Sequence, residues 1–241
     1  MSNQVGWAFE TTLDVEWTHA IAPGASMVLL TSPVDETQGV QGMPEFLSLE
    51  KYALDHKLGK LISQSWGTTE NTLFTPAGRQ VFDAFEGLNE RCVREKVTVL
   101  ASSGDTGSSN VEVNGMFFPS PTVGFLASSP FVTAVGGTSL FANTSGKYQD
   151  EIVWNDHVFV AGGGGVSQQF SEPSYPDSLP PSVQQMLNDG RGIPDVAYDA
   201  DGNTSILVFA TFLPPPFQGY FAVGGTSEGS PQWAGIVADA N

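Results

Sequence analysis

The sequence is poor in the residues that build disulfides and metal centres. It holds one cysteine, Cys92, and three histidines among 241 residues, so no intrachain disulfide and no cysteine-based zinc or iron–sulfur site can form. The histidines, His19, His56 and His157, show no zinc-binding spacing such as HExxH. We therefore expect no catalytic metal, and the helix-like context of Cys92 favours a buried, inert thiol.

Basic residues and long apolar runs are also scarce. Nine Lys and Arg stand against 26 Asp and Glu, which gives a formal net charge of −17 and a pI near 4.2. This charge argues against nucleic acid or an anionic membrane as a partner, because like charges repel. No apolar run of about 18 residues marks a transmembrane helix, and the first residues show no signal-peptide pattern. The composition is typical of a protein that stays soluble and works in acid.

What is present is enough for a folded core. Hydrophobic residues make up 40% of the chain and aromatic residues 11%, which argues against disorder despite the high net charge. The 27 glycines and 16 prolines predict many turns. No charge-rich linker interrupts the chain, so we predict a single domain over residues 1–241.

The pattern of apolar residues predicts an α/β fold. Strand-like apolar runs lie at 25–30, 60–65 and 97–102, and helical spacing covers 43–58 and 76–95. Such alternation indicates a mostly parallel central sheet with helices on both faces. The second half is loop-rich, with short strands expected near 131–135 and 205–210.

The sharpest candidate for a nucleophile is Ser227. It follows Gly-Gly-Thr, and Pro231 and a helix-like stretch come after it. A serine at a helix N-terminus faces free N–H groups that favour developing negative charge, although the same residue can be a plain helix cap. An earlier Gly-Gly-Thr-Ser at 136–139 lacks the proline, so we expect a strand end and a turn there.

The candidate partners of such a serine are carboxyl groups. Glu10 and Asp14 are spaced i,i+4, so on a helix they share one face, and one carboxyl could orient the other. Acidic pairs at this spacing are no more frequent here than chance predicts, so a solvated acidic face is the alternative. Asp105 follows the strand predicted at 97–102, where α/β proteins place ligands. When protonated it could donate a hydrogen bond to an oxyanion, and otherwise it would cap its own turn.

Two glycine-containing segments remain. Gly162 to Gly165 lack the Lys-Ser/Thr of a phosphate loop, so they predict a close approach of backbone to backbone or to a ligand. The chain also has no GxGxxG after a strand, which leaves a dinucleotide site unsupported.

Together these pieces resemble the sedolisins, the serine-carboxyl peptidases with a subtilisin-like fold. The resemblance covers most of the chain, in the family's order. The matching motifs are Glu-x-x-Leu-Asp at 10–14, Ala-Pro-Gly-Ala at 22–25, Ser-Gln-Ser-Trp-Gly at 63–67, Ser-Gly-Asp-Thr-Gly at 103–107, Ser-Pro-Phe-Val-Thr-Ala-Val-Gly-Gly-Thr at 129–138, Gly-Gly-Gly-Val-Ser at 163–167, Pro-Asp-Val-Ala at 194–197 and Gly-Thr-Ser-x-x-x-Pro-x-x-Ala-Gly at 225–235.

The resemblance implies an endopeptidase that acts at acidic pH. It makes Ser227 the nucleophile, Glu10 its general base, Asp14 the carboxyl that orients Glu10, and Asp105 the acid that stabilises the oxyanion. The backbones of two segments would hold an extended substrate. These segments are Ser65, Trp66 and Gly67, and Gly163, Gly164 and Gly165.

The resemblance also sets expectations beyond the site. Family members carry a pro-domain, act outside the cell, and bind calcium through residues that would lie beyond Asn241 here. Compared with the family, the chain is short at both ends. Three alternatives stay open: a tripeptidyl exopeptidase of the same family, a non-catalytic acidic binding domain with the peptidase fold, and a histidine-dependent subtilase, which would need a histidine close to Ser227.

Overall fold

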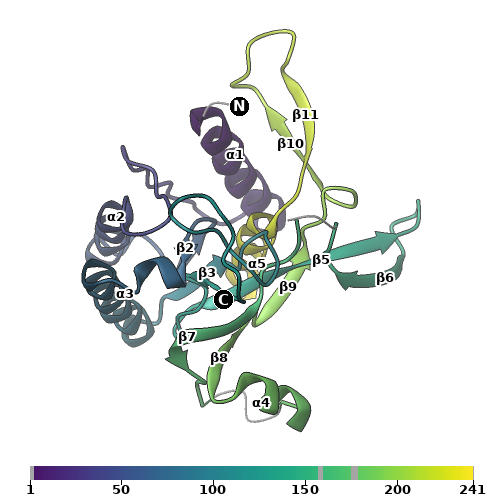
Figure 1. Cartoon of the computed structure of the whole chain (residues 1–241). Coiled ribbons are helices and arrows are strands. Elements are labelled where there is room, and N and C mark those ends of the chain that lie inside the picture. Colours follow the sequence, from purple (N-terminus) through teal and green to yellow (C-terminus); the bar gives the residue numbers. More distant parts are fainter. Residues whose placement is uncertain (1–2, 157–159, 175–178, 241) are drawn as a thin grey trace.

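The computed structural model describes residues 3–156, 160–174 and 179–240, and a five-stranded sheet lies at its centre (Figure 1). Four strands run parallel, so that β1 pairs β3, β3 pairs β5 and β5 pairs β9. The fifth strand, β6, pairs the far half of β5 in the antiparallel sense. The strands are β1 (Leu61–Gln64), β3 (Thr98–Ser102), β5 (Thr133–Ala142), β6 (Tyr148–Val153) and β9 (Val196–Asp199).

Helices cover both faces of this sheet, as the sequence predicts. Alternate residues of β3 show the two faces. Val99 and Ala101 pack into the core beside α2 and α3, whereas Leu100 packs with Ala234 of α5. The helices around the sheet are α1 (Asn3–Ile21), α2 (Met43–Asp55), α3 (Pro76–Glu95) and α5 (Thr226–Ala240). The candidate residues Glu10 and Asp14 lie on α1, and Ser227 lies on α5.

Local signals in the sequence fix the start of α3. Its cap is Thr75, whose hydroxyl accepts a hydrogen bond from the Gly78 N–H at 3.0 Å, and Pro76 occupies the first turn. Phe82 and Phe85 on its inner face are buried and meet Phe125 edge to face. The predicted helix at 76–95 is confirmed to the residue.

Short paired strands and turns make up most of the remaining chain. Three two-stranded antiparallel sheets are formed by β2 with β4, β7 with β8, and β10 with β11. Their bounds, with those of the other short elements, are β2 (Thr68–Thr69), η1 (Glu70–Leu73), β4 (Gly124–Phe125), β7 (Gly165–Ser171), α4 (Pro181–Leu187), β8 (Gly190–Ile193), β10 (Ile206–Ala210) and β11 (Gly219–Val223).

Two sequence predictions are wrong. The apolar run at 25–30 forms neither helix nor strand, and Met27, Val28 and Leu29 are exposed. An apolar run alone does not supply the neighbouring strand that a ladder needs. The tetrapeptide at 136–139 lies inside β5 rather than at a strand end, because β9 pairs with residues 136–138 and β6 pairs with Thr138 and Ser139. Cys92 is buried, as expected.

Candidate active site

The site is built where α1 crosses α5. A Cβ atom at Gly235 of α5 would lie 2.7 Å from Ile21 Cβ, so the missing side chain allows the two helices to touch. The Thr18 hydroxyl of α1 also donates a hydrogen bond to the Pro231 carbonyl of α5 at 3.2 Å. This contact holds the helix that carries Glu10 and Asp14 against the helix that carries Ser227.

Ser227 lies in the first turn of α5 and is half-buried. Pro231 has no N–H, so the helix cannot supply the usual donor to the Ser227 carbonyl. The Ser65 hydroxyl lies 3.4 Å from that carbonyl oxygen. A second link between β1 and α5 joins the hydroxyls of Ser63 and Ser230 at 3.0 Å. The start of α5 is therefore held over the end of β1.

Glu10 faces Ser227 from α1. Burial raises the pKa of Glu10 most, the negative charge of Asp14 raises it further, and a hydrogen bond with the Ser227 side chain opposes the shift. The Oε1 atom of Glu10 is buried and has no hydrogen-bond partner among the described residues. Glu10 is thus a buried carboxyl in direct contact with the candidate nucleophile.

Asp14 lies one helical turn after Glu10. Burial raises its pKa, and the Ser65 hydroxyl, which donates a hydrogen bond to Asp14 Oδ1 at 2.7 Å, lowers it. Two neighbouring buried carboxyls resist carrying two negative charges, so the pair retains a proton in mildly acidic solution. Because Oδ1 accepts from Ser65, the other oxygen of Asp14 is the one free to hold that proton.

Asp105 approaches the same place from the loop after β3. Its Oδ1 atom accepts hydrogen bonds from the Thr226 N–H at 2.7 Å and the Thr226 hydroxyl at 2.9 Å. Burial nevertheless raises the pKa of Asp105. Since Oδ1 is engaged by two donors, a proton on this carboxyl belongs on Oδ2.

Glycines make the close approach of Asp105 possible. A Cβ at Gly225, whose φ is 122°, would lie 2.7 Å from Asp105 Oδ2. A Cβ at Gly163 would lie 2.3 Å from the Ser103 carbonyl oxygen, and the Gly163 N–H donates to the Gly104 carbonyl at 2.6 Å. The predicted close approach of backbone to backbone at 162–165 is confirmed.

A cavity of about 230 Å³ opens beside Ser227. Ser65, Trp66 and Gly67 line it, together with Asp105 and Thr226. The Trp66 ring itself turns away into the core, where it packs on Phe46 with ring centroids 4.2 Å apart, so this wall is largely backbone. None of the described glycines at 163–165 lines the cavity; they support the Asp105 loop instead.

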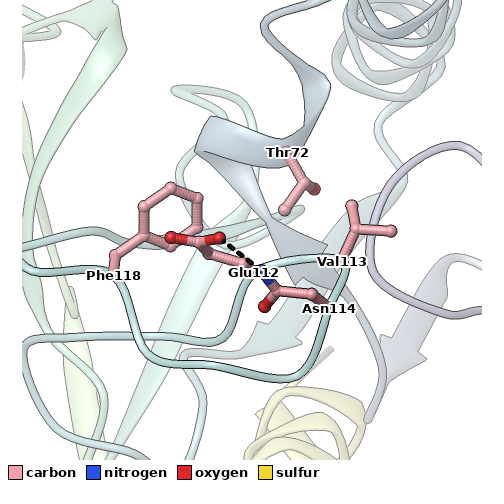
Figure 2. Close-up of a pocket in the computed structure, with 5 residues that line it drawn as sticks. All are labelled: Thr72, Glu112, Val113, Asn114 and Phe118. Carbon is pink, nitrogen blue, oxygen red and sulfur yellow. Dashed lines mark hydrogen bonds between the residues drawn. The ribbon is translucent and has the colours of Figure 1, made fainter.

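A larger cavity of about 430 Å³ lies elsewhere (Figure 2). Thr72 and the loop residues Glu112, Val113, Asn114 and Phe118 line it. The Asn114 side chain donates a hydrogen bond to Glu112 at 2.9 Å, which the dashed line in Figure 2 marks. This cavity shares no lining residue with the one beside Ser227, so size alone does not identify the site.

Three further expectations can be compared with the structure. His56 stacks on Tyr52 at the end of α2, His19 lies near the end of α1, and His157 lies outside the described residues. Within the described ranges, no group of three His, Cys, Asp or Glu side chains could hold a metal ion. None of the helices described is long and apolar enough to cross a membrane.

Sequence reasoning missed three partners of the site. Thr226 supplies both donors to Asp105, and the Ser65 side chain holds Asp14, whereas the sequence pointed only to the Ser65 backbone. Glu36 is the third, because its charge raises the pKa of Glu10. Thr226 and Ser65 adjoin recognised motifs, but nothing in the pattern around Glu36 distinguishes it from other acidic residues.

Comparison with known proteins finds curated relatives that align with almost all of the chain. Kumamolisin from Bacillus sp. (strain MN-32) is 35% identical to the chain over 236 residues, which is 96% of the chain and 39% of kumamolisin. Tripeptidyl-peptidase 1 from Rattus norvegicus is 31% identical over 96% of the chain and 39% of its own length. No family model matches the chain. The chain therefore spans about two fifths of the length of these curated relatives.

A solved structure shows the same fold. Pseudomonas sedolisin, a serine-carboxyl proteinase complexed with two molecules of pseudo-iodotyrostatin, matches with a TM-score of 0.76 and 28% identity. The match covers 96% of this chain and 61% of the sedolisin chain. With its subtilisin-like α/β architecture and its alignment over 96% of its length to these relatives, the chain is similar to the sedolisins, the serine-carboxyl peptidases.

Proposed function

We propose that the protein containing this chain hydrolyses peptide bonds as a serine peptidase that works in acid. The observation that carries the proposal is the contact between Ser227 at the start of α5 and the buried carboxyl of Glu10 on α1. A serine hydroxyl needs a neighbouring base to become a nucleophile. Glu10 is the group in position to act as that base.

In the first step, Ser227 Oγ attacks the scissile carbonyl carbon while its proton passes to Glu10. The tetrahedral intermediate collapses when the C–N bond breaks, and Glu10 returns the proton to the leaving amine. A water molecule then attacks the acyl carbon, Glu10 takes the proton of that water, and Ser227 recovers it as the acid product leaves. Asp14, held by Ser65, orients Glu10 and keeps a proton on the pair.

The developing oxyanion needs a hydrogen-bond donor. Protonated Asp105 would supply one from Oδ2, because Thr226 occupies Oδ1. The N-terminus of α5 adds its positive dipole end close to Ser227. Removal of such a donor costs about 10²- to 10³-fold in kcat in serine peptidases, so Asp105 carries a substantial part of the proposed catalysis.

The pKa shifts of Asp105 and Glu10 act in opposite directions on the proposed activity: the raised pKa of Asp105 keeps its proton at low pH, whereas the raised pKa of Glu10 delays formation of the base. Burial raises the pKa of Asp105, so the donor is present at low pH and lost as the pH rises through its pKa. Glu10 must lose a proton to act as base, which sets the acidic limit. The proposed pH–rate profile is therefore bell-shaped, with an acidic limb set by Glu10 and an alkaline limb set by Asp105.

Substitution of the base tests the proposal. Hydrolysis of an unstructured peptide is followed between about pH 3 and 7 for the parent protein, for Glu10→Gln and for Glu16→Gln, a matched change on the same helix. We expect Glu10→Gln to lower kcat by about 10³-fold or more and Glu16→Gln to leave it unchanged. Full activity in Glu10→Gln would remove the proposed base.

A labelling experiment separates an enzyme from a non-catalytic domain with the same fold. A fluorophosphonate probe reacts with an activated serine hydroxyl. We expect labelling of the parent at pH 4–5 and none of Ser227→Ala, whereas Ser48→Ala, an exposed serine on α2, labels like the parent. Absence of labelling in the parent would favour the non-catalytic alternative.

The relatives also favour a second form of the activity. Tripeptidyl-peptidase 1 enzymes align over 96% of the chain, so release of tripeptides from peptide N-termini stands beside endopeptidase action as a candidate. For the surroundings of the enzyme we propose an extracellular or lumenal acidic compartment and a pro-domain in the full-length protein. A calcium ion remains an expectation from the family, and no step above depends on it.

A further inference from the structure

A buried carboxyl on α2 contacts the strand that leads to the candidate active site. Glu50, on α2, is 6% exposed, and Gln64, the last residue of β1, is 2% exposed. The Gln64 Nε2 amide donates a hydrogen bond to Glu50 Oε1. The proposed mechanism uses neither side chain, so this buried pair needs an explanation of its own.

The remaining oxygen atoms of the two side chains lack partners. Glu50 Oε2 and Gln64 Oε1 are both buried without a hydrogen-bond partner among the described residues, and an unsatisfied buried acceptor is costly. Both atoms are acceptors when Glu50 is ionised, so neither can satisfy the other. A proton on Glu50 Oε2 would make this atom a donor to Gln64 Oε1. One proton would thus satisfy both atoms and join a planar acid to a planar amide by two hydrogen bonds.

The surroundings of Glu50 favour the protonated form. Burial raises the pKa of Glu50 to about 8. The titratable side chain that faces it from α3 is Cys92, whose thiol pKa is raised by burial first and then by the charge of Glu50, and none of the four residues of β1 is titratable. The neighbouring bases, Lys51 on α2 and Arg91 on α3, are both held by Asp55 at 2.6 Å. Since these bases are engaged by Asp55, a proton is the group available to neutralise Glu50.

Gln64 and Ser65 hold the end of β1 from opposite faces. Successive side chains of an extended chain point to opposite sides, so Gln64 turns toward α2 whereas Ser65 turns toward α1 and α5. The Ser65 hydroxyl donates a hydrogen bond to Asp14 Oδ1 at 2.7 Å and lies 3.4 Å from the Ser227 carbonyl oxygen. A displacement of Gln64 would therefore also move the side chain that holds Asp14.

The residue after Ser65 is held by the same helix. The Trp66 ring packs on Phe46 with ring centroids 4.2 Å apart. Phe46 and Glu50 are spaced i,i+4 on α2, so they lie one turn apart on one face. This face of α2 thus contacts both chain neighbours of Ser65, Gln64 through Glu50 and Trp66 through Phe46.

We propose that Glu50 keeps a proton in the folded protein, pairs with the Gln64 side chain through two hydrogen bonds, and in this way positions Ser65. Glu50 is then a positioning residue, which acts on Asp14 through β1 and touches no reacting atom. The positioning role rests on the proposed peptidase function, whereas the acid–amide pair does not.

Infrared spectroscopy tests the pair without any substrate. The carbonyl stretch of a protonated carboxylic acid is separate from the bands of a carboxylate, and Glu50→Gln removes the contribution of Glu50 alone. We expect the difference between the parent and Glu50→Gln at about pH 6 to contain the band of one protonated acid, although an ordinary glutamate is ionised at this pH. In Gln64→Leu the band should shift, because the acid loses its partner. A carboxylate band in the difference, or an unshifted acid band in Gln64→Leu, would overturn the proposed pair.

Kinetics test the positioning role. Glu50→Met keeps a similar volume but removes both polar atoms, whereas Glu50→Gln can form an amide–amide pair with Gln64 that needs no proton. We expect Glu50→Met to lower kcat about tenfold with KM unchanged, because Asp14 is no longer well oriented, and Glu50→Gln to keep the kcat of the parent. The double variant Glu50→Gln/Gln64→Glu exchanges acid and amide and should keep it as well. Glu45→Gln, on the same helix, is the matched control.

The outcomes separate the inference from the function on which it rests. A kcat that falls equally in Glu50→Met and Glu50→Gln, or in neither, would overturn the positioning role. If Glu50→Met does not fold, the exchanged double variant decides, because an impaired kcat in a protein with a restored pair would contradict the proposal. A parent protein that cleaves no peptide but shows the protonated Glu50 band would count against the peptidase function alone.

Discussion

The tetrapeptide Gly-Gly-Thr-Ser occurs at 136–139 and at 224–227, and the two copies fold differently. The first lies inside β5, with β9 and β6 paired along it. The second turns from β11 into α5, with φ of 122° at Gly225. The copies touch, because a Cβ at Gly137 would lie 3.3 Å from Thr226 Cγ2. Identical sequence thus gives a structural strand in one place and the candidate catalytic turn in the other.

The neighbours of each copy explain the difference. Gly136 and Gly137 sit where side chains would collide, with Pro194 Cγ at 2.5 Å and Ala200 Cβ at 2.8 Å from the Cβ positions. These two glycines are needed because no side chain fits at their positions. The glycine at 225 serves a left-handed turn and leaves room for Asp105. The same residue type is required in both copies for two unrelated reasons.

Each copy also donates a hydroxyl to a carboxylate, with opposite results. Ser139 donates to Asp201 Oδ2 at 2.7 Å, and Thr226 donates to Asp105 Oδ1 at 2.9 Å. Burial raises the pKa of Asp201, but hydrogen bonds from Ser139 and Asn203 outweigh it and the pKa is lowered. At Asp105 burial prevails and the pKa is raised. The balance of donors against burial therefore lowers the pKa of Asp201 and raises the pKa of Asp105.

The largest expected effect comes from removing these two carboxyls, Asp105 and Asp201, one at a time. Asp105→Ala removes the proposed oxyanion donor and should lower kcat by about 10²- to 10³-fold, whereas Asp201→Ala should leave kcat unchanged. Asp105→Asn keeps a neutral donor at every pH, so its activity should extend to higher pH than that of the parent. Steady-state kinetics measured across pH test this role of Asp105. An unchanged alkaline limit in Asp105→Asn would contradict the proposal that protonated Asp105 is the oxyanion donor.

Substitution of one glycine in each copy is expected to have the next largest effect. Gly225→Ala adds a Cβ against Asp105 at a positive φ, so we expect both stability and kcat to fall, with kcat lower by about tenfold or more. Gly137→Ala overpacks the sheet against Ala200 and should cost about 1–3 kcal/mol of unfolding free energy. Denaturant titration and kinetics on both variants are compared. A Gly137→Ala protein that loses kcat but keeps its stability would contradict a purely packing role for Gly137.

Glu228, directly after the second copy, should dominate the alkaline loss of stability. Burial first, and then the charge of Asp199, raise its pKa to about 9. The unfolded carboxyl ionises near its ordinary value, so the contribution of Glu228 is fully present below about pH 4.5 and is lost as the pH rises through about 9. Glu228→Gln should flatten the fall in unfolding free energy between pH 5 and 9, by an amount on the order of 2 kcal/mol.

The control for this effect is Glu50, which is away from the site. Burial raises its pKa to about 8, against a hydrogen bond from Gln64, so Glu50→Gln should flatten the same pH range without touching Ser227. Urea midpoints measured at pH 5, 7 and 9 separate the two contributions. Parallel curves for the parent and Glu228→Gln would show that Glu228 ionises normally in the folded protein.

The smallest effect is expected at the first copy. Ser139→Ala deprives Asp201 of one donor and should lower the unfolding free energy by about 1 kcal/mol at pH 7. Because the folded pKa of Asp201 is lowered, its stabilisation is present above the unfolded pKa and disappears as the pH falls through the folded value. The variant and parent should converge near pH 2 in thermal melts, with kcat the same for both. A gap that widened in acid would contradict this.

Much of the fold could be predicted because local patterns agreed with tertiary packing. The helix at 76–95 has its own cap, its own proline and a regular apolar face, so its bounds needed no knowledge of the rest. The apolar run at 25–30 and the tetrapeptide at 136–139 depended on a neighbouring strand, whose presence or absence is not written in those residues. Strand pairing over long sequence separations decided both.

The residues of the candidate site also fall into two groups, those that stand in a recognisable motif and those that do not. Glu10, Asp14, Asp105 and Ser227 stand in motifs, and the structure places them around one cavity and the α1–α5 contact. Glu36 has no motif and reaches Gly67 only because Gly42 closes its segment. A residue that a loop closure of this kind brings to the site leaves no recognisable pattern in the sequence.

The crossing of α1 and α5 at Gly235 also has a consequence for biosynthesis. Glu10 and Ser227, the proposed base and nucleophile, lie far apart in the sequence on α1 and α5, and the contact between these helices brings them together. Such a pairing of high sequence separation forms late, after the loop between its partners has closed. During synthesis the carboxyl of Glu10 exists long before Ser227 is added. We therefore expect the proposed site to assemble only after α1 and α5 have packed together.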